Sequence, residues 1–267
     1  MDVQKTAPFE LGPKNPKAGS KGRVLLLHGF TGSPWDVLPL GEALAADGYQ
    51  VRGPRLAGHG TTPEAMSLVS ARDWEEGAVE ALEQYSADGP VHMAGLSMGA
   101  LLSIICAARH PLRVRSLILM APAMQFIGPT LWLVRAARNY PLIERVRPWE
   151  HKESTDIENA LERNAAPVLH RFPTARLRDL FQVQETAREL MPRVTTPALI
   201  VAGDHDHVVS VDGARELAAG LSGPVRLVRL TRGFHIQPRD DGREVLFEEA
   251  RVFLKQYPTG ESSFQER

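Results

Sequence analysis

Residues 91–99 read Val-His-Met-Ala-Gly-Leu-Ser-Met-Gly, an apolar run that ends in a G-x-S-x-G pattern and passes at once into a helical pattern, Met98–Arg109. A sharp strand-to-helix turn lifts the serine oxygen above the edge of a sheet, and small residues around it let the helix approach the strand. The helix N-terminus adds amides and a positive dipole near a developing negative charge. We therefore expect Ser97 to be a nucleophile. The alternative is an ordinary strand–turn–helix with an incidental serine.

A serine hydroxyl needs a base if it is to attack at neutral pH. That base should follow a late strand of the same sheet. Val225–Leu230 is such a strand candidate, and it leads into Thr-Arg-Gly-Phe-His (231–235). His235 is therefore the predicted base.

The predicted acid lies in the loop Gly-Asp-His-Asp-His-Val-Val (203–209), directly after a strand candidate at residues 198–202. Asp204 is nearer the end of the strand, whereas Asp206 fits a G-x-x-D-x-x-V spacing. We favour Asp206 as the carboxylate that holds the imidazole tautomer, with Asp204 as a turn residue. The alternating Asp and His also suggest a metal site, but further spaced ligands are missing, so we expect no metal.

An oxyanion hole requires two backbone amides. One should belong to Met98, directly after the nucleophile, and the other to the loop His-Gly-Phe-Thr-Gly (28–32) that follows the first buried strand candidate. Phe30 is the candidate for the second amide. Its side chain could also line the acyl pocket, and a plain core phenylalanine is the alternative.

Strand and helix patterns alternate along most of the chain and end in an amphipathic helix, Arg243–Gln256. This alternation predicts a mostly parallel sheet flanked by helices. Residues 125–193 break the alternation, with helical patterns such as 131–138 and 157–164 but no clear strand. They are too long for a simple connection. We predict a helical cap at 125–193, inserted into one core domain that comprises 1–124 and 194–267.

The predicted site supports a single core, because Ser97 precedes the insertion whereas Asp206 and His235 follow it. Residues 1–22 are rich in Pro, Gly and Lys, and we expect them to form an arm on the surface. Within the cap, Trp132 belongs to a strongly apolar stretch. Two interpretations of Trp132 are equally favoured: either it lines the acyl pocket, or it packs on the core.

Composition excludes several classes of protein. With 31 Lys and Arg against 32 Asp and Glu, the net charge of −1 leaves no basic footprint for nucleic acid. The apolar stretches are far shorter than the roughly 20 residues of a membrane helix. Cys106, the single cysteine, cannot form an intramolecular disulfide. The first twenty residues lack the apolar region of a signal peptide, so we expect a cytoplasmic protein.

These residues resemble the α/β-hydrolase superfamily, and more narrowly its bacterial carboxylesterase and monoacylglycerol lipase group. The resemblance covers roughly residues 23–257 and rests on Leu-Leu-Leu-His-Gly-Phe-Thr-Gly (25–32), Gly-His-Gly (58–60), the Ser97 motif, the Asp206 loop and His235. It implies an eight-stranded, mostly parallel sheet, a small helical cap, an acyl-enzyme mechanism and no cofactor. Phe234 departs from the pattern, because this group often has glycine before the histidine.

The first functional hypothesis is a serine esterase for short- to medium-chain acyl esters, including monoacylglycerols. Within the same fold, the alternatives are a thioesterase, a carbon–carbon bond hydrolase and a perhydrolase. A hypothesis of another class is a small-molecule receptor that retains the fold. A complete candidate triad of Ser97, Asp206 and His235 argues against the receptor.

Overall fold

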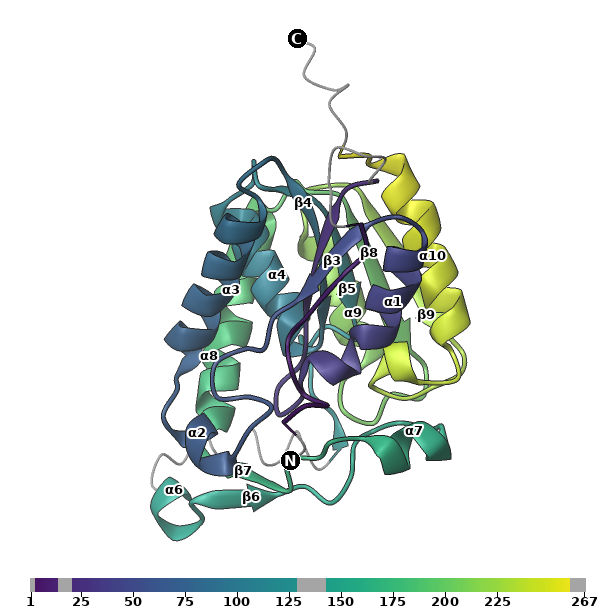
Figure 1. The fold of residues 1–267 in the computed structure, drawn as a ribbon. Coiled ribbons are helices and arrows are strands. Elements are labelled where there is room, and N and C mark those ends of the chain that lie inside the picture. The colour runs from purple at the N-terminus through teal and green to yellow at the C-terminus, as the bar shows by residue number, and fades with distance from the viewer. Residues whose placement is uncertain (1–2, 14–20, 129–142, 260–267) are drawn as a thin grey trace.

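The structure, a computed structural model, describes residues 3–13, 21–128 and 143–259. In this part of the chain one central sheet has seven strands in the order β1-β3-β2-β4-β5-β8-β9 (Figure 1). Only the edge pair β1–β3 is antiparallel; every other neighbouring pair is parallel. The strands are β1 (Phe9–Leu11), β2 (Arg23–Leu27), β3 (Gln50–Gly53), β4 (Val91–Leu96), β5 (Val114–Met120), β8 (Ala198–Gly203) and β9 (Val225–Leu230).

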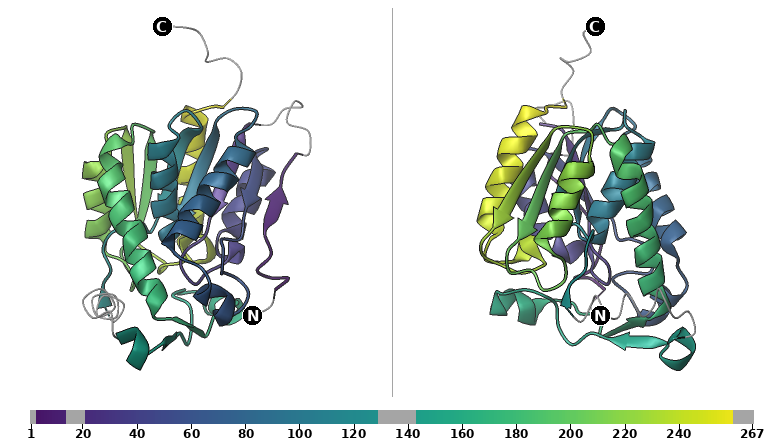
Figure 2. Two further views of the ribbon diagram at one scale, coloured as in Figure 1. Left: turned by 90° about the vertical axis from the view of Figure 1, so that its left-hand side faces the viewer. Right: turned by 180° about the vertical axis from the view of Figure 1, so that it is seen from behind.

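Helices cover both faces of the sheet (Figures 1 and 2). One face carries α1 and α10, and the opposite face carries α3, α4, α8 and α9. These helices are α1 (Leu38–Ala46), α3 (Ala71–Tyr85), α4 (Met98–Arg109), α8 (Ala175–Leu190), α9 (Val211–Gly220) and α10 (Arg243–Gln256). Shorter helical turns are η1 (Pro34–Asp36), α2 (Pro63–Ser67), η2 (Met191–Arg193) and η3 (Gln237–Arg239).

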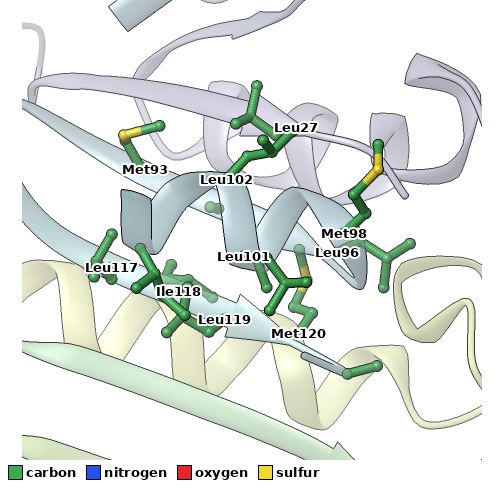
Figure 3. Packing of buried hydrophobic residues seen from close by; sticks show 14 of the residues in the cluster. Leu27, Met93, Leu96, Met98, Leu101, Leu102, Leu117, Ile118, Leu119 and Met120 are labelled. Atoms are coloured by element: carbon green, nitrogen blue, oxygen red, sulfur yellow. The ribbon is translucent and has the colours of Figure 1, made fainter. Parts of the chain in front are cut away.

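The core forms where α4 crosses the central strands. Every residue of β4 and β8 is buried, as expected for parallel strands covered by helices on both faces. Leu101 and Leu102 of α4 pack among Leu27, Leu96 and Met120 (Figure 3). Their burial fixes the start of α4 against the end of β4, and this is the point where the Ser97 turn lies.

The strand count differs from the eight strands that the family resemblance implied, since the described residues contribute seven to the central sheet. The predicted surface arm also takes part in it. Residues 9–11 form β1, which pairs with β3 at the edge. A three-residue strand is too short to show an alternating pattern in the sequence, which explains why this pairing was not predicted.

The expectation that the insertion contains no strand was wrong. Its described residues hold a two-stranded antiparallel hairpin of β6 (Trp149–His151) and β7 (Arg171–Pro173). The helices α6 (Ile143–Val146) and α7 (Ala160–Ala165) accompany it, and α7 is shorter than the predicted 157–164 because the Asn159 side chain caps its start. The helix predicted at 131–138 lies outside the described residues.

The last helix of the predicted cap, α8, packs against α4 and α3 on one face of the sheet. It therefore shares the helical layer of the core. We propose that the cap comprises residues 125–174 and that the core resumes at α8. Among the residues that the structure describes, no helix is long and apolar enough to span a bilayer.

Candidate active site

The turn between β4 and α4 holds Ser97 in a strained conformation, with φ 57° and ψ −113°. Two neighbouring glycines make the turn sterically possible. A Cβ on Gly95 would lie 2.2 Å from the Gly99 oxygen, and a Cβ on Gly99 would lie 2.2 Å from the Leu27 oxygen. Such contacts are closer than any real Cβ makes, so both positions require glycine. Backbone strain of this kind costs about 1–3 kcal/mol and is typical of functional sites.

Ser97 and His235 both line a cavity of about 290 Å³ at the end of the sheet where the cap lies. Both residues are otherwise nearly enclosed, at 7% and 6% exposure. The Ser97 hydroxyl forms no hydrogen bond with any described residue. Catalytic hydrogen bonds are often long before substrate binds. The turn thus presents the serine oxygen to the same space as the imidazole.

Two amides beside Ser97 have no acceptor in the described part of the chain. The Met98 amide is the first of α4, and amides in the first helical turn lack an intrahelical partner. The Phe30 amide follows Gly29, where an added Cβ would lie 3.2 Å from the Ser97 Cβ. The two predicted oxyanion donors are therefore both unpaired, and the loop of Phe30 lies against the serine.

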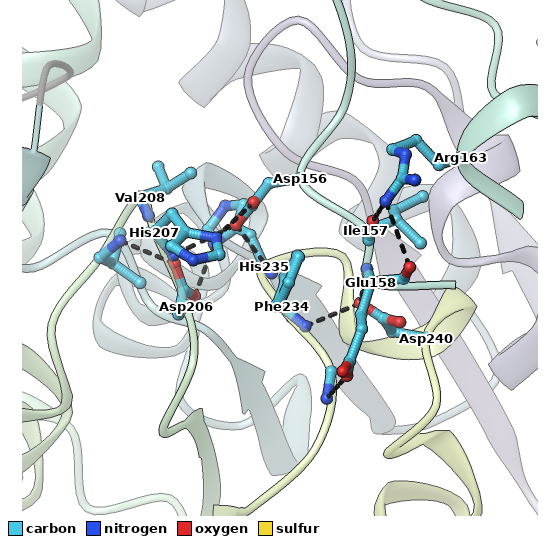
Figure 4. Close-up of polar contacts among 12 residues, drawn as sticks. Asp156, Ile157, Glu158, Arg163, Asp206, His207, Val208, Phe234, His235 and Asp240 are labelled. Atoms are coloured by element: carbon cyan, nitrogen blue, oxygen red, sulfur yellow. Dashed lines mark hydrogen bonds and ion pairs between the residues drawn. The ribbon is translucent and has the colours of Figure 1, made fainter. Parts of the chain in front are cut away.

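His235 is fixed by Asp206, as Figure 4 shows. The Nδ1 atom of the imidazole lies 2.8 Å from Asp206 Oδ2. The other carboxylate oxygen of Asp206 accepts the amides of Val208 and Val209, both at 2.8 Å. The carboxylate is thus oriented by its own loop, and Nε2 remains as the imidazole nitrogen available to the cavity.

Burial and nearby charges shift the pKa of His235 in opposite directions, and they do the same to the pKa of Asp206. Burial disfavours protonation of His235 most strongly, but the charge of Asp206, its hydrogen bond and the charge of Asp156 together raise the pKa of His235 above its ordinary 6.5. For Asp206 burial is again the largest effect, and His235 with the two loop amides outweighs it and lowers the pKa of this carboxyl. An ionised Asp206 beside a basic His235 is the electrostatic arrangement that a general base needs.

The other members of the Asp-His-Asp-His loop have different partners. Asp204 forms an ion pair with Arg229 at 2.8 Å and does not contact His235. His207 Nδ1 lies 2.9 Å from Asp156 of the insertion. Among the described residues, His, Cys, Asp and Glu form no group of three suited to a metal ion. The structure therefore brings Asp206 alone of the two candidate acids to the imidazole.

The cavity is lined by both apolar and polar residues. The apolar ones include Phe30, which also packs edge-to-face against Phe172 and Trp74. Phe30 thus lines the cavity and belongs to an aromatic cluster at once. The remaining large apolar lining residues are Leu96, Phe126, Val168, Phe172, Leu177, Leu180, Val208 and Ile236. Trp132, the other predicted pocket residue, lies outside the described residues.

Sequence reasoning missed three charged residues of the cavity lining: Asp36, Lys152 and Asp156. Asp156 accepts the backbone amides of His235 and His207, both at 3.2 Å, and so ties the insertion to the base and acid loops (Figure 4). Lys152 and Asp156 belong to no recognisable spacing, and only the folded insertion brings them to the site, so the sequence carried no signal for these two. Asp36 belongs to the core, where it closes a capping box with Ser33 at the start of η1, and that spacing does not point to a cavity.

Comparisons with known proteins agree with this geometry. The chain is 29% identical over 238 residues to the thermostable monoacylglycerol lipase of Bacillus sp. (strain H-257), covering 88% of this chain and 90% of that one. It is 25% identical to a carboxylesterase of Bacillus subtilis (strain 168), covering 96% and 98%. A solved structure from work on LipS and LipT, two metagenome-derived lipolytic enzymes, matches with a TM-score of 0.84 at 28% identity, covering 94% of this chain and 98% of that one.

The fold and the site together define a serine hydrolase of the α/β-hydrolase fold, and these similarities place it among the ester hydrolases. Residues 18–240 match the family described as serine aminopeptidase, S33, and the chain belongs to that family.

Proposed function

We propose that this protein hydrolyses carboxylic esters of short- to medium-chain acids, including monoacylglycerols, through an acyl-enzyme intermediate. The observation that carries this proposal is the cavity, whose lining brings Ser97 and His235 together with a set of apolar residues and with charged and polar residues. Its volume of about 290 Å³ is at the small end of ligand pockets, about 300–1,000 Å³, which favours shorter acyl chains. The relatives named as monoacylglycerol lipase and carboxylesterase support the same substrate class.

In the proposed mechanism Ser97 Oγ attacks the ester carbonyl carbon while His235 Nε2 takes the hydroxyl proton. The amides of Phe30 and Met98 bind the resulting oxyanion. The carbon–oxygen bond to the alcohol then breaks, and the departing oxygen takes the proton from His235. A water molecule, deprotonated by His235, attacks the acyl-Ser97 ester. The bond between the acyl carbon and Ser97 Oγ then breaks, Oγ takes the proton back from His235, and the acid is released. Asp206 stabilises the imidazolium in both halves of the reaction.

The test is a panel of nitrophenyl esters from acetyl to palmitoyl, together with monoacylglycerols and matched thioesters. We expect the highest kcat/KM between butyryl and decanoyl esters. Rapid quenching followed by mass spectrometry should show one acyl group on the peptide that contains Ser97. A preference for thioesters would favour the thioesterase alternative, and labelling of Ser97 without turnover would favour a receptor. Cell fractionation would test the cytoplasmic location, which stays a prediction.

The pH profile gives one prediction. His235 must be neutral to act as a base. Burial, the largest effect, lowers its pKa, but Asp206 and Asp156 together outweigh burial and raise the pKa above 6.5. We therefore expect kcat/KM for nitrophenyl butyrate to rise with pH as His235 loses its proton. The apparent pKa of this rise should lie above 6.5. Stopped assays in buffers of constant ionic strength would measure this. An acid limb with a midpoint below 6.5 would contradict the assignment.

Chain-length preference gives a second prediction. Leu180 of α8 is one of the apolar residues that line the cavity. Leu180→Trp should shorten the space for the acyl chain, and the kcat/KM ratio of decanoyl to butyryl ester should fall by about 10-fold, because each buried methylene contributes about 0.8 kcal/mol. Leu112→Trp is the matched control, since Leu112 is 92% exposed and precedes β5 at the other end of the sheet. An unchanged ratio in Leu180→Trp would remove α8 from the acyl subsite.

A further inference from the structure

The turn that carries the Phe30 amide contains an unfavourable backbone conformation. Gly32 donates its amide to the Gly29 oxygen at 3.2 Å, so residues 29–32 form a β-turn. Thr31, the third residue of the turn, has φ 59°. A positive φ at this position is usually adopted by glycine, and for a β-branched residue it is a genuine outlier. Because glycine would fit without strain, the threonine points to a role for its side chain.

The Thr31 hydroxyl binds a lysine from the cap. Lys152 Nζ donates to Thr31 Oγ1 at 3.0 Å, and both residues line the cavity. Lys152 directly follows β6, and its amide donates to the His170 oxygen at 2.9 Å, which fixes its backbone to the hairpin. This hydrogen bond therefore connects the cap hairpin to the turn beside the nucleophile.

Two carboxylates lie near enough to the lysine to affect its charge. Burial lowers the pKa of Lys152, and the charges of Asp36 and Asp156 oppose this and favour the ammonium. Asp36 also contacts the turn, because its Oδ2 accepts the Ser33 amide at 3.1 Å and would lie 2.0 Å from a Cβ on Gly32. The turn is thus held by Asp36 of the core and by Lys152 of the cap.

We propose that Lys152 is a positioning residue for the oxyanion hole, an inference that rests on the proposed ester hydrolysis. Its hydrogen bond to Thr31 holds the strained turn so that the Phe30 amide faces the developing oxyanion. Full activity then depends on the cap hairpin being seated on the core. Since the bond supports a donor that acts most strongly on the transition state, its loss lowers kcat and leaves KM nearly unchanged.

The experiment compares Lys152→Met, Thr31→Val, Thr31→Ser and the double variant Lys152→Met/Thr31→Val in the full chain. Lys152→Met keeps the apolar stem and removes the donor, and Thr31→Val keeps the β-branch and removes the acceptor. Thr31→Ser retains the hydroxyl. The exposed Lys255 of α10 supplies the control Lys255→Met. Thermal unfolding of each variant confirms that it folds before its kinetics are compared.

We expect kcat for nitrophenyl butyrate to fall by about 10- to 100-fold in Lys152→Met and in Thr31→Val, somewhat less than the 10²–10³-fold loss from deleting an oxyanion donor. Thr31→Ser and Lys255→Met should remain within about 3-fold of the wild type. The double variant should be no slower than either single variant, because both remove the same hydrogen bond. The proposal would be overturned if the losses of kcat in the two single variants multiplied in the double variant. A rise in KM at constant kcat in the single variants would also overturn it.

A second readout separates this inference from the proposed substrate class. The rate at which a fluorophosphonate labels Ser97 requires the oxyanion hole but no ester substrate. If the wild type is labelled rapidly and hydrolyses none of the esters, the proposed function fails. The labelling rates still decide the inference in that case: a 10-fold slower rate in Lys152→Met supports it, and an unchanged rate contradicts it.

Discussion

Replacing Ser97 with alanine should abolish ester hydrolysis, with kcat reduced by about 10⁵- to 10⁶-fold. The loss is this large because serine, base and acid act as one unit, and without the hydroxyl no acyl-enzyme forms. Alanine retains the Cβ that already occupies the turn at φ 57°, so the strain and the fold are unchanged. Kinetics with nitrophenyl butyrate, fluorophosphonate labelling and thermal unfolding would measure these effects together.

Ser103→Ala is the matched control for this prediction. Ser103 lies on α4, the helix that follows Ser97, is fully buried, and donates its hydroxyl to the Gly99 oxygen at 2.8 Å. Its replacement should reduce the free energy of unfolding by about 1 kcal/mol and leave Ser97 labelling intact. Hydrolysis retained in Ser97→Ala, at a rate near the wild type, would remove the proposed mechanism.

Asp206→Asn should lower kcat by about 10⁴-fold. The asparagine oxygen can still accept the amides of Val208 and Val209, so the loop keeps its shape. The change removes the charge that favours the imidazolium, and the new NH₂ group can donate to His235 Nδ1 and select the wrong tautomer. The apparent pKa on the acid side of the pH profile should therefore fall as well.

Asp204→Asn is the comparison that decides between the two candidate acids. Asp204 pairs with Arg229, which is half-exposed, and such surface pairs contribute about 0–1 kcal/mol. We expect activity within about 3-fold of the wild type and a small change in thermal stability. A severe loss in Asp204→Asn with an active Asp206→Asn would reverse the assignment of the acid.

Much of the core was predictable because its signals are local and strong. The bounds predicted for α4, β9 and α10 are confirmed to the residue. Apolar periodicity over ten or more residues identifies a helix, and an apolar run beside glycine identifies a buried strand. The strands β1, β6 and β7 were missed because three residues cannot display a period.

The residues of the candidate site also fall into two groups, those that local sequence patterns predict and those that they do not. Ser97, Asp206 and His235 were chosen because each follows a core strand, and in a parallel sheet those strand ends meet at one edge. Lys152 and Asp156 follow no core strand and fit no motif. Their approach to the turn at Thr31 and to His235 depends on how the cap folds over that edge.

By itself, the sequence determined the alternating core, the strained serine turn and the order in which nucleophile, acid and base follow the strands. These features depend on side-chain periodicity and on the steric freedom of glycine, which act over a few residues. Only the tertiary structure decided that Asp206 meets His235, that β1 joins the sheet, and that Lys152 reaches Thr31 across 121 residues. Those contacts join distant segments, and their geometry is set by packing and by the pairing of buried polar groups.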